Sequence, residues 1–367
     1  MAILGASMAD DQSPHEAAGG RRLALPPGPI FHLQRAHEAE HEIGAFRAWA
    51  GYKDYGSNGA TDGLVLFQHV LSFGPSETSG RTGIHCHLAH VHIILPSSGR
   101  GAFSYDGVVT EAIPGSVICQ HGGTVHDQFV YSYAAASAEE NRKTPVTIDP
   151  PSPDAPVRSF SFLEFFVPRT IADVELVAPA AVTAEDQATA WDHPYHAPGA
   201  SFALQTAEDP GAAWRPVVGL PALQVRDCAT WAPSNRLVAT QILRSASEGP
   251  AAGEAMPLEI AGETGGLEVY LVVQGAVGFA APDGTPLTLN TGDCLTCTAG
   301  LAGAPEAPSA DLRLLRFFVS SRAEDLYERS REEIERLEAL GPAIARRREV
   351  RPAGDDRPIN FLNDPGA

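Results

Sequence analysis

The sequence predicts an all-β chain built from two similar halves, with a helix near the C-terminus. Of its 367 residues, 35 are glycine and 30 are proline, as is typical of short strands joined by frequent turns. Apolar runs rich in β-branched and aromatic residues follow one another in the same order twice. The length alone predicts two or three domains.

The repeat can be followed from turn to turn. His92 lies seven residues before Gly99, and Glu268 lies seven residues before Gly275. The later turns and the closing apolar run match as well: Pro282-Asp283-Gly284 with Asp106-Gly107, Thr291-Gly292-Asp293 with Pro114-Gly115-Ser116, and 315–319 with 163–167. A repeated order of turns and strands indicates a duplicated domain.

Histidines are concentrated in the first half. Six of the 13 histidines fall between residues 85 and 126. His85 and His87 share one face of a strand because side chains alternate. Two imidazoles on one face can chelate an ion at roughly 2.0–2.1 Å. We therefore interpret the cluster as a metal site, and four hydrogen-bonded core histidines are the alternative.

These residues also resemble a known family. The spacing His85-x-His87-x4-His92-x6-Gly99 is similar to the first cupin motif, whose third ligand is usually glutamate. The segment from 107 to His126 resembles the second cupin motif, with His121 where proline is common and Ser116 where aspartate is common. The resemblance implies two double-stranded β-helix barrels, a bicupin, with one metal bound by His85, His87, His92 and His126.

On this basis the chain divides into five segments. They are an N-terminal arm (1–54), a metal-binding barrel (55–170), a connecting segment (171–214), a degenerate barrel (215–320), and a C-terminal helix and tail (321–367). We expect strands over 64–73 and 157–167, a polar loop over 134–156 that forms a lid or an oligomer contact, and an amphipathic helix over 321–340.

The second half lacks the histidines of the first. The positions matching His85 and His87 are Ala261 and Glu263, and no histidine follows His196. We expect the second barrel to bind no metal in the same way. Its expected roles are to bury the open sheet of the first barrel or to build a dimer.

Four imidazoles contribute no carboxylate, so the full charge of a divalent ion remains to polarise a substrate. The resemblance implies one divalent metal, Fe(II) before Mn, Ni, Cu or Zn, and a dioxygenase that cleaves a small hydroxylated aromatic or enolisable substrate. The alternatives are a Zn or Ni lyase, isomerase or cyclase, and a non-catalytic small-molecule-binding bicupin. Catalytic candidates are His90, His121 and Tyr105, and adjacent pocket candidates are Gln120, Asp127 and Gln128.

Charge and composition limit the classes of partner that we expect. The formal net charge is −19, which disfavours nucleic acid and anionic membranes because the summed field repels them. No secretory signal or apolar membrane span is visible, and five cysteines form no disulfide framework. Cys294 and Cys297 are expected to be buried strand residues. We expect a cytoplasmic homodimer acting on a small molecule.

Overall fold

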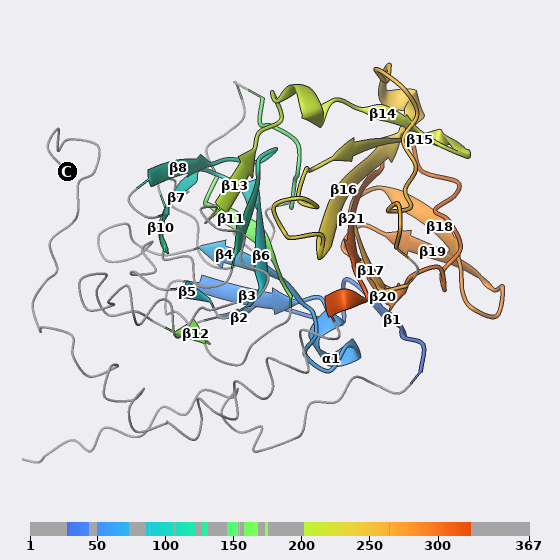
Figure 1. Cartoon of the computed structure of the whole chain (residues 1–367), viewed down its shortest axis with the longest axis horizontal. Helices are drawn as coiled ribbons and strands as arrows, with labels where there is room; N and C mark the ends of the chain where they lie inside the picture. Colours follow the sequence, from blue (N-terminus) through green and yellow to red (C-terminus); the bar gives the residue numbers. More distant parts are fainter. Residues whose placement is uncertain are drawn as a thin grey trace, which may run out of the picture.

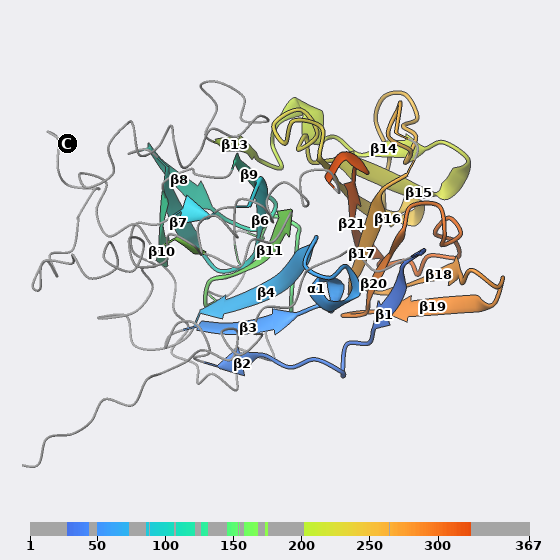
Figure 2. The ribbon, with the colours of Figure 1, turned by 60° about the horizontal axis from the view of Figure 1, so that its bottom comes forward.

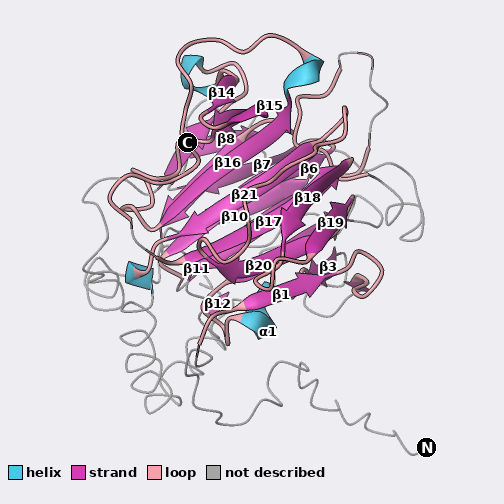
Figure 3. Cartoon of the chain, turned by 90° about the vertical axis from the view of Figure 1, so that its right-hand side faces the viewer, coloured by secondary structure: helices cyan, strands magenta, loops and turns pink. Residues whose placement is uncertain are grey.

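The computed structural model describes residues 28–43, 50–72, 86–87, 89–105, 108–121, 126–130, 145–152, 154, 158–167, 173–174, 202–263 and 265–323. Strands dominate these residues (Figure 3), and the helical elements are short: α1 (Ser57–Ala60) and the 3-10 turns η2 (Pro210–Ala212) and η3 (Ala246–Glu248). None of the helices in the described ranges has the length and apolar character needed to cross a membrane. The described residues are thus mostly β, in agreement with that part of the predicted fold class.

The first half forms a seven-stranded antiparallel sheet in the order β13-β9-β6-β11-β4-β3-β2. Its strands are β2 (Glu42–Ile43), β3 (Ala50–Asp54), β4 (Leu66–Ser72), β6 (Val91–Ser98), β9 (Val117–His121), β11 (Ser161–Val167) and β13 (Phe202–Gln205). A smaller sheet, β10-β7-β8, comprises β7 (Gly101–Tyr105), β8 (Val108–Ala112) and β10 (His126–Val130). A third pair joins β5 (Cys86–His87) to β12 (Asp173–Val174).

The second half repeats this arrangement in the order β1-β20-β17-β21-β16-β15-β14. Its strands are β1 (Phe31–Gln34), β14 (Arg215–Val217), β15 (Leu220–Asp227), β16 (Val238–Ser245), β17 (Leu267–Gln274), β20 (Cys294–Thr298) and β21 (Arg313–Val319). A hairpin of β18 (Ala276–Ala280) and β19 (Pro286–Asn290) completes it. The two halves thus have the same strand order, as the duplicated sequence predicts.

Turn geometry repeats with the strands. Gly99 and Gly275, which the sequence aligns, both adopt a left-handed backbone, with φ of 63° and 79°. Gly115 and Gly292 do so too, with φ of 94° and 87°. Glycine suits these positions because it lacks the Cβ that makes positive φ costly. The matching conformations support the duplication.

Both large sheets also contain strands from sequence outside the expected barrels: β2, β3 and β13 in the first half and β1 in the second. β1, from the expected N-terminal arm, pairs with β20 of the second half, so that blue and orange strands lie side by side in Figure 2. β13, from the expected connecting segment, pairs with β9 of the first half. The arm and the connector therefore link the two halves through main-chain hydrogen bonds.

The two large sheets pack against each other through one continuous core, and the halves lie side by side in Figure 1. At its centre the Phe165 and Phe317 rings stack with centroids 4.0 Å apart, and the Phe67 ring meets Phe317 edge-on at 5.1 Å. Burial of apolar surface is the main stabilising contribution of such a contact. The second half thus buries the sheet of the first, one of the two roles predicted for it.

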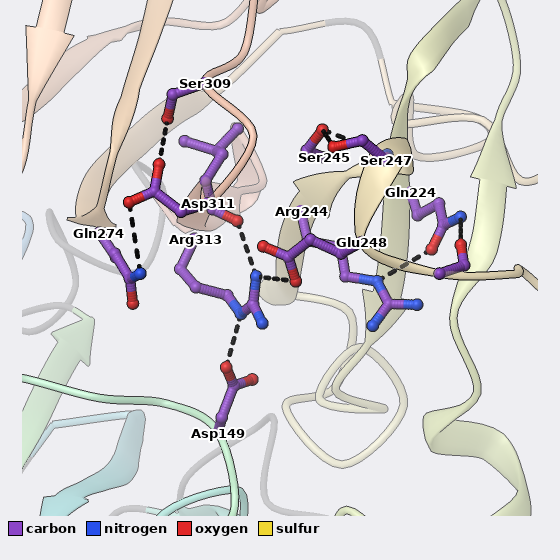
Figure 4. A network of polar contacts seen from close by, with 12 residues as sticks. Asp149, Gln224, Arg244, Ser245, Ser247, Glu248, Gln274, Ser309, Asp311 and Arg313 are labelled. Carbon is purple, nitrogen blue, oxygen red and sulfur yellow. Dashed lines mark hydrogen bonds and ion pairs between the residues drawn. The ribbon is translucent and has the colours of Figure 1, made fainter.

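A polar network also crosses between the halves (Figure 4). Asp149, which lies within the predicted 134–156 loop, accepts a hydrogen bond from Arg313 Nε of β21 at 2.6 Å. Arg313 also pairs with Glu248 at 2.5 Å. Both ion pairs are partly exposed, and contributions of such pairs to stability are usually small. They fix the position of the 145–152 segment against the second half.

Two predicted features fall largely outside the described residues. These are the loop over 134–156, of which 145–152 and 154 are described, and the helix over 321–340, of which only 321–323 are described. Both therefore stay predictions, as do the domain boundaries.

Candidate metal centre

Strand alternation decides which side chains of the first half face its interior. On β6, Val91, Ile93 and Leu95 belong to the core between the two sheets. His92 and Ile94 lie on the opposite face, where Ile94 packs into a separate cluster with Phe103 and Phe162. His92 is therefore directed into the first barrel.

The strands on either side of β6 place further polar groups on the same face. On β9, Gln120 alternates with Cys119, which belongs to the core between the sheets. On β11, Glu164 alternates in the same way with Phe165. The cross-strand register sets Gln120 opposite His92 and Glu164 opposite Ile94. Three adjacent strands thus supply the buried polar side chains of one site.

The His92 ring is held from two sides. Its Nδ1 lies 2.7 Å from Gln120 Nε2, and its face stacks on Phe166 with centroids 3.9 Å apart and planes 11° apart. Gln120 Oε1 is buried and has no hydrogen-bond partner among the described residues. If the Gln120 amide is turned by half a turn, its Oε1 accepts a hydrogen bond from the Nδ1–H of His92. The lone pair on His92 Nε2 is then available to an ion.

Glu164 adds a carboxylate to this site. Its Oε2 lies 3.3 Å from His92 Nε2, and its Oε1 accepts a hydrogen bond from Gln68 Nε2 of β4. The glutamate is 7% exposed. The structure thus places a carboxylate beside His92, which the two sequence motifs do not indicate. The sequence argument considered only the two motifs, whereas β11 brings Glu164 beside His92 from 72 positions further along the chain.

His126 approaches from the smaller sheet. It begins β10, opposite Tyr105 of β7, and is 3% exposed. Its ring centroid lies 6.4 Å from that of His92 and 5.7 Å from that of Tyr105. Two imidazoles bound to one ion have centroids at most about 6.5 Å apart, given metal–nitrogen distances of roughly 2.1 Å. The separation between His92 and His126 is within that limit.

Tyr105 is a catalytic candidate whose ring lies beside that of His126. It is fully buried, and its ring stacks on Phe202 of β13 at 4.3 Å. Its hydroxyl has no hydrogen-bond partner among the described residues. Burial raises the pKa of the Tyr105 phenol well above its usual value near 10. Tyr105 therefore remains a neutral hydrogen-bond donor at physiological pH.

The other predicted residues are placed in part. His85 lies outside the described residues, and His87 lies on β5 opposite Asp173. The buried His90 directly precedes β6, and His121 ends β9 opposite Val91. Of the pocket candidates, Asp127 and Gln128 lie on β10, and Gln128 is buried. In the described ranges no three His, Cys, Asp or Glu side chains are placed as a complete ion site, so the four-histidine set stays a prediction.

The second barrel places a different group at the matching positions. Glu268 of β17 corresponds to His92, and its Oε1 accepts hydrogen bonds from Arg316 Nη2 at 2.7 Å and from Tyr270 Oη at 3.0 Å. Arg316 of β21 also donates to Gln241 and to the Leu258 carbonyl. A buried guanidinium therefore provides the positive charge in this barrel.

The cysteine pair of the second half is structural. Cys294 belongs to the core between the sheets and Cys297 to the interior of the second barrel, on opposite faces of β20. Both are buried free thiols. Burial raises the pKa of Cys297 to about 12. The prediction of two buried strand residues is confirmed.

No family model and no curated protein sequence matches the chain. Among solved structures, a variant of oxalate decarboxylase from Bacillus subtilis matches at 10% identity, covering 83% of this chain and 79% of that one, with a TM-score of 0.43. A putative glyoxylate-induced protein from Pseudomonas aeruginosa matches at 8% identity, with 82% and 91% coverage and a TM-score of 0.43.

A pirin from Escherichia coli in complex with nickel(II) matches at 12% identity, covering 79% of this chain and 99% of that one, with a TM-score of 0.40. These matches span about four fifths of the chain at identities of 8–12%.

Proposed function

We propose that the chain is a metal-dependent cupin enzyme whose active site is the interior of the first barrel. The observation that carries this proposal is the convergence of His92 and His126 with Tyr105, Gln120 and Glu164 in the interior of the first barrel. Buried polar groups are costly unless they are satisfied. A cluster of them in a barrel interior is typical of a ligand site.

The metal ligands we propose are His85, His87, His92 and His126. The donor chemistry fits a divalent ion, since imidazole suits Fe, Cu, Ni and Zn. A bound ion of this kind acts as a Lewis acid on an enol, phenol or carboxylate oxygen, and iron(II) adds reactivity toward oxygen. Fe(II) is the metal we favour, before Mn, Ni, Cu or Zn.

The remaining side chains fit a small planar substrate. Tyr105 can donate a hydrogen bond to an anionic substrate oxygen because its phenol stays protonated. Phe166, which stacks on His92, and Phe202, which stacks on Tyr105, present flat apolar surfaces beside the two polar rings. Aromatic rings pack face to face with such surfaces. These features favour a hydroxylated aromatic or enolisable compound.

The reaction we propose is oxygen-dependent cleavage of that substrate. The second candidate is a lyase, isomerase or cyclase reaction without oxygen, since the same oxygen ligation acidifies a substrate proton. A non-catalytic small-molecule-binding bicupin is the third. A cytoplasmic homodimer remains the expected form of the protein.

The test combines metal analysis with oxygen uptake. Protein purified without chelator is assayed with catechols, gentisate-like acids, flavonols and 1,3-diketones, in air and anaerobically. Iron together with oxygen-dependent turnover supports the dioxygenase. Zinc or nickel with anaerobic turnover supports the lyase or cyclase, and bound metal without turnover supports the binding protein.

A further inference from the structure

Three arginines share one face of the large sheet of the second half. On β15, Leu223 and Val225 face the interior of the second barrel, so Arg226 lies on the opposite face, toward the first half. On β16, Arg244 lies on that same face, and the cross-strand register sets it opposite Arg313 of β21. Each guanidinium carries a full positive charge at physiological pH.

Arg313 has its own counter-charges. Asp149 lies 2.6 Å from its Nε, and Glu248 lies 2.5 Å from its Nη1 (Figure 4). Among the described residues, neither Arg226 nor Arg244 forms an ion pair with a carboxylate. This face therefore carries more positive charge than the carboxylates described beside it can balance.

Arg226 is buried with few acceptors around it. It is 4% exposed, and its Nε has no hydrogen-bond partner among the described residues. Its Nη2 donates to the Ile148 carbonyl over a long 3.5 Å. Asp227, the next residue, faces the other side of the strand. A buried guanidinium is costly unless an anion and hydrogen bonds compensate for its lost hydration.

Arg316 shows how the same chain satisfies an arginine that is buried to a similar degree. It is 3% exposed. Its Nε and Nη2 donate to Glu268 Oε1 at 3.2 Å and 2.7 Å, and its Nη1 donates to the Leu258 carbonyl at 2.8 Å and to Gln241. The described surroundings of Arg226 hold no such set of acceptors. An oxyanion from solution would complete it.

Trp214 lies beside both of the guanidiniums that lack an ion pair. The centroid of its ring is 4.4 Å from the Arg244 guanidinium carbon and 5.8 Å from that of Arg226. The face of an aromatic ring attracts a cation but does not neutralise its charge. Arg244 otherwise donates to neutral oxygens, those of Gln224 and Pro250. It is only partly buried, so an ion from solvent can reach this end of the pair.

We propose that Arg226 and Arg244 form a binding site for a small oxyanion beside Trp214. A carboxylate or phosphate group matches the edge of a guanidinium, whose nitrogens donate two parallel hydrogen bonds to it. The Nε of Arg226 is the donor that such a group satisfies. The low exposure of Arg226 limits the ligand to a small ion. The site lies outside the interior of the first barrel and does not depend on a metal there.

The alternative is that Arg226 serves only the fold, through its contacts with Ile148 and Trp214. The two accounts differ in how stability responds to anions. A ligand that binds only the native state raises the melting temperature as its concentration rises. Phosphate and acetate also stabilise proteins without binding to a site. The informative quantity is therefore the rise in the wild type beyond that in Arg226→Gln.

The experiment titrates the full chain with phosphate and, separately, with acetate, at an ionic strength held constant with chloride. Binding is followed by calorimetry and tryptophan fluorescence, with thermal melts alongside. We expect one or both anions to bind, and about 10-fold weaker binding or more in Arg226→Gln, because charge-assisted hydrogen bonds are lost. Trp214→Phe should still bind but lose the fluorescence change. Arg100→Gln is the matched control, because Arg100 pairs with Glu111 on the exposed surface, and it should bind as the wild type does.

A wild-type protein that binds neither anion would overturn the inference. Wild-type affinity in Arg226→Gln, with a lowered melting temperature that the anions raise equally in both proteins, would assign Arg226 to the fold instead. Should Arg226→Gln fail to fold, the partly buried Arg244 provides the second variant. Wild-type affinity in Arg244→Gln would then overturn the inference, and a loss of binding would support it.

Discussion

Glu164 and Arg316 occupy equivalent positions in the two halves of the chain and carry opposite charges. Glu164 pairs across the sheet with Gln68, and Arg316 pairs with Gln241. Each also contacts the residue that lies seven positions before the turn glycine in its own half, His92 or Glu268. The two halves thus share the strand pairing and the glutamine but differ in the charged pair.

The ion pair of the second barrel should be essential for its stability. Glu268 and Arg316 are 8% and 3% exposed. Removal of one partner of a buried pair leaves the other uncompensated, at a cost of about 3–5 kcal/mol. We expect Glu268→Gln to lower the free energy of unfolding by about that amount, measured by urea denaturation.

A double variant provides the control. Replacement of both partners by leucine, Glu268→Leu with Arg316→Leu, removes both charges, and such exchanges are often neutral or stabilising. The double variant should therefore be more stable than Glu268→Gln. A loss of less than about 1 kcal/mol in Glu268→Gln would show that the pair is as weak as an exposed one.

Tyr105 should contribute to turnover and not to stability. Its buried hydroxyl has no hydrogen-bond partner among the described residues, and such a group costs about 1–3 kcal/mol. Tyr105→Phe should leave the free energy of unfolding unchanged or raise it, while kcat falls because a donor to the substrate oxygen is lost. Lower stability with unchanged kcat would assign Tyr105 to the fold instead.

Stability should fall in mild acid because of His69 on β4. Burial, followed by the nearby charges of His41 and Lys53, lowers the pKa of His69 well below 6.5. Below pH 6.5 the unfolded state therefore binds a proton that the native state does not. Stability is present above that pH and is lost as the pH falls, by up to about 1.4 kcal/mol per unit for one proton.

Replacement of His69 tests this linkage. His69→Asn should flatten the decline in unfolding free energy between about pH 6.5 and 5, compared with the wild type in the same buffers. The variant also loses the contact with Ser97 Oγ at 3.1 Å, so only the slope is informative. A slope equal to that of the wild type would contradict the assignment.

His90 and His92 can be distinguished as ligands by single replacements. His92 faces the barrel interior beside Glu164, so His92→Ala should lose most bound metal. His90→Ala should retain it. Metal analysis of both variants decides the matter. Loss of metal in His90→Ala alone would show that His90, and not His92, is the ligand.

The sequence predicts the duplication well because turns and strands are local. Gly99 and Gly275, aligned by spacing alone, share a left-handed backbone. The exchange of β1 and β13 between the halves could not be predicted, since strand pairing over such separations leaves no local pattern. The equal spacing of His92 and Glu268 from the following turn glycine predicted that these two residues correspond.

Glu164 and Arg316 were missed for a related reason. Glu164 is the only acidic residue of β11, and Arg316 is the central residue of β21. Both strands are buried. A lone charge in an apolar run was the available signal, because such a charge is seldom buried without a partner. Its partner, however, lies about 50 to 70 residues earlier in the chain, as the contacts of Arg316 and Glu164 show.

The most direct test of the central claim is the metal content of protein purified without chelator, wild type beside His126→Ala. The account predicts one divalent ion per chain in the wild type and loss of most of it in His126→Ala, because removal of one imidazole leaves an incomplete ligand set. A wild-type protein without a divalent ion, or a full ion retained in both His92→Ala and His126→Ala, would contradict it.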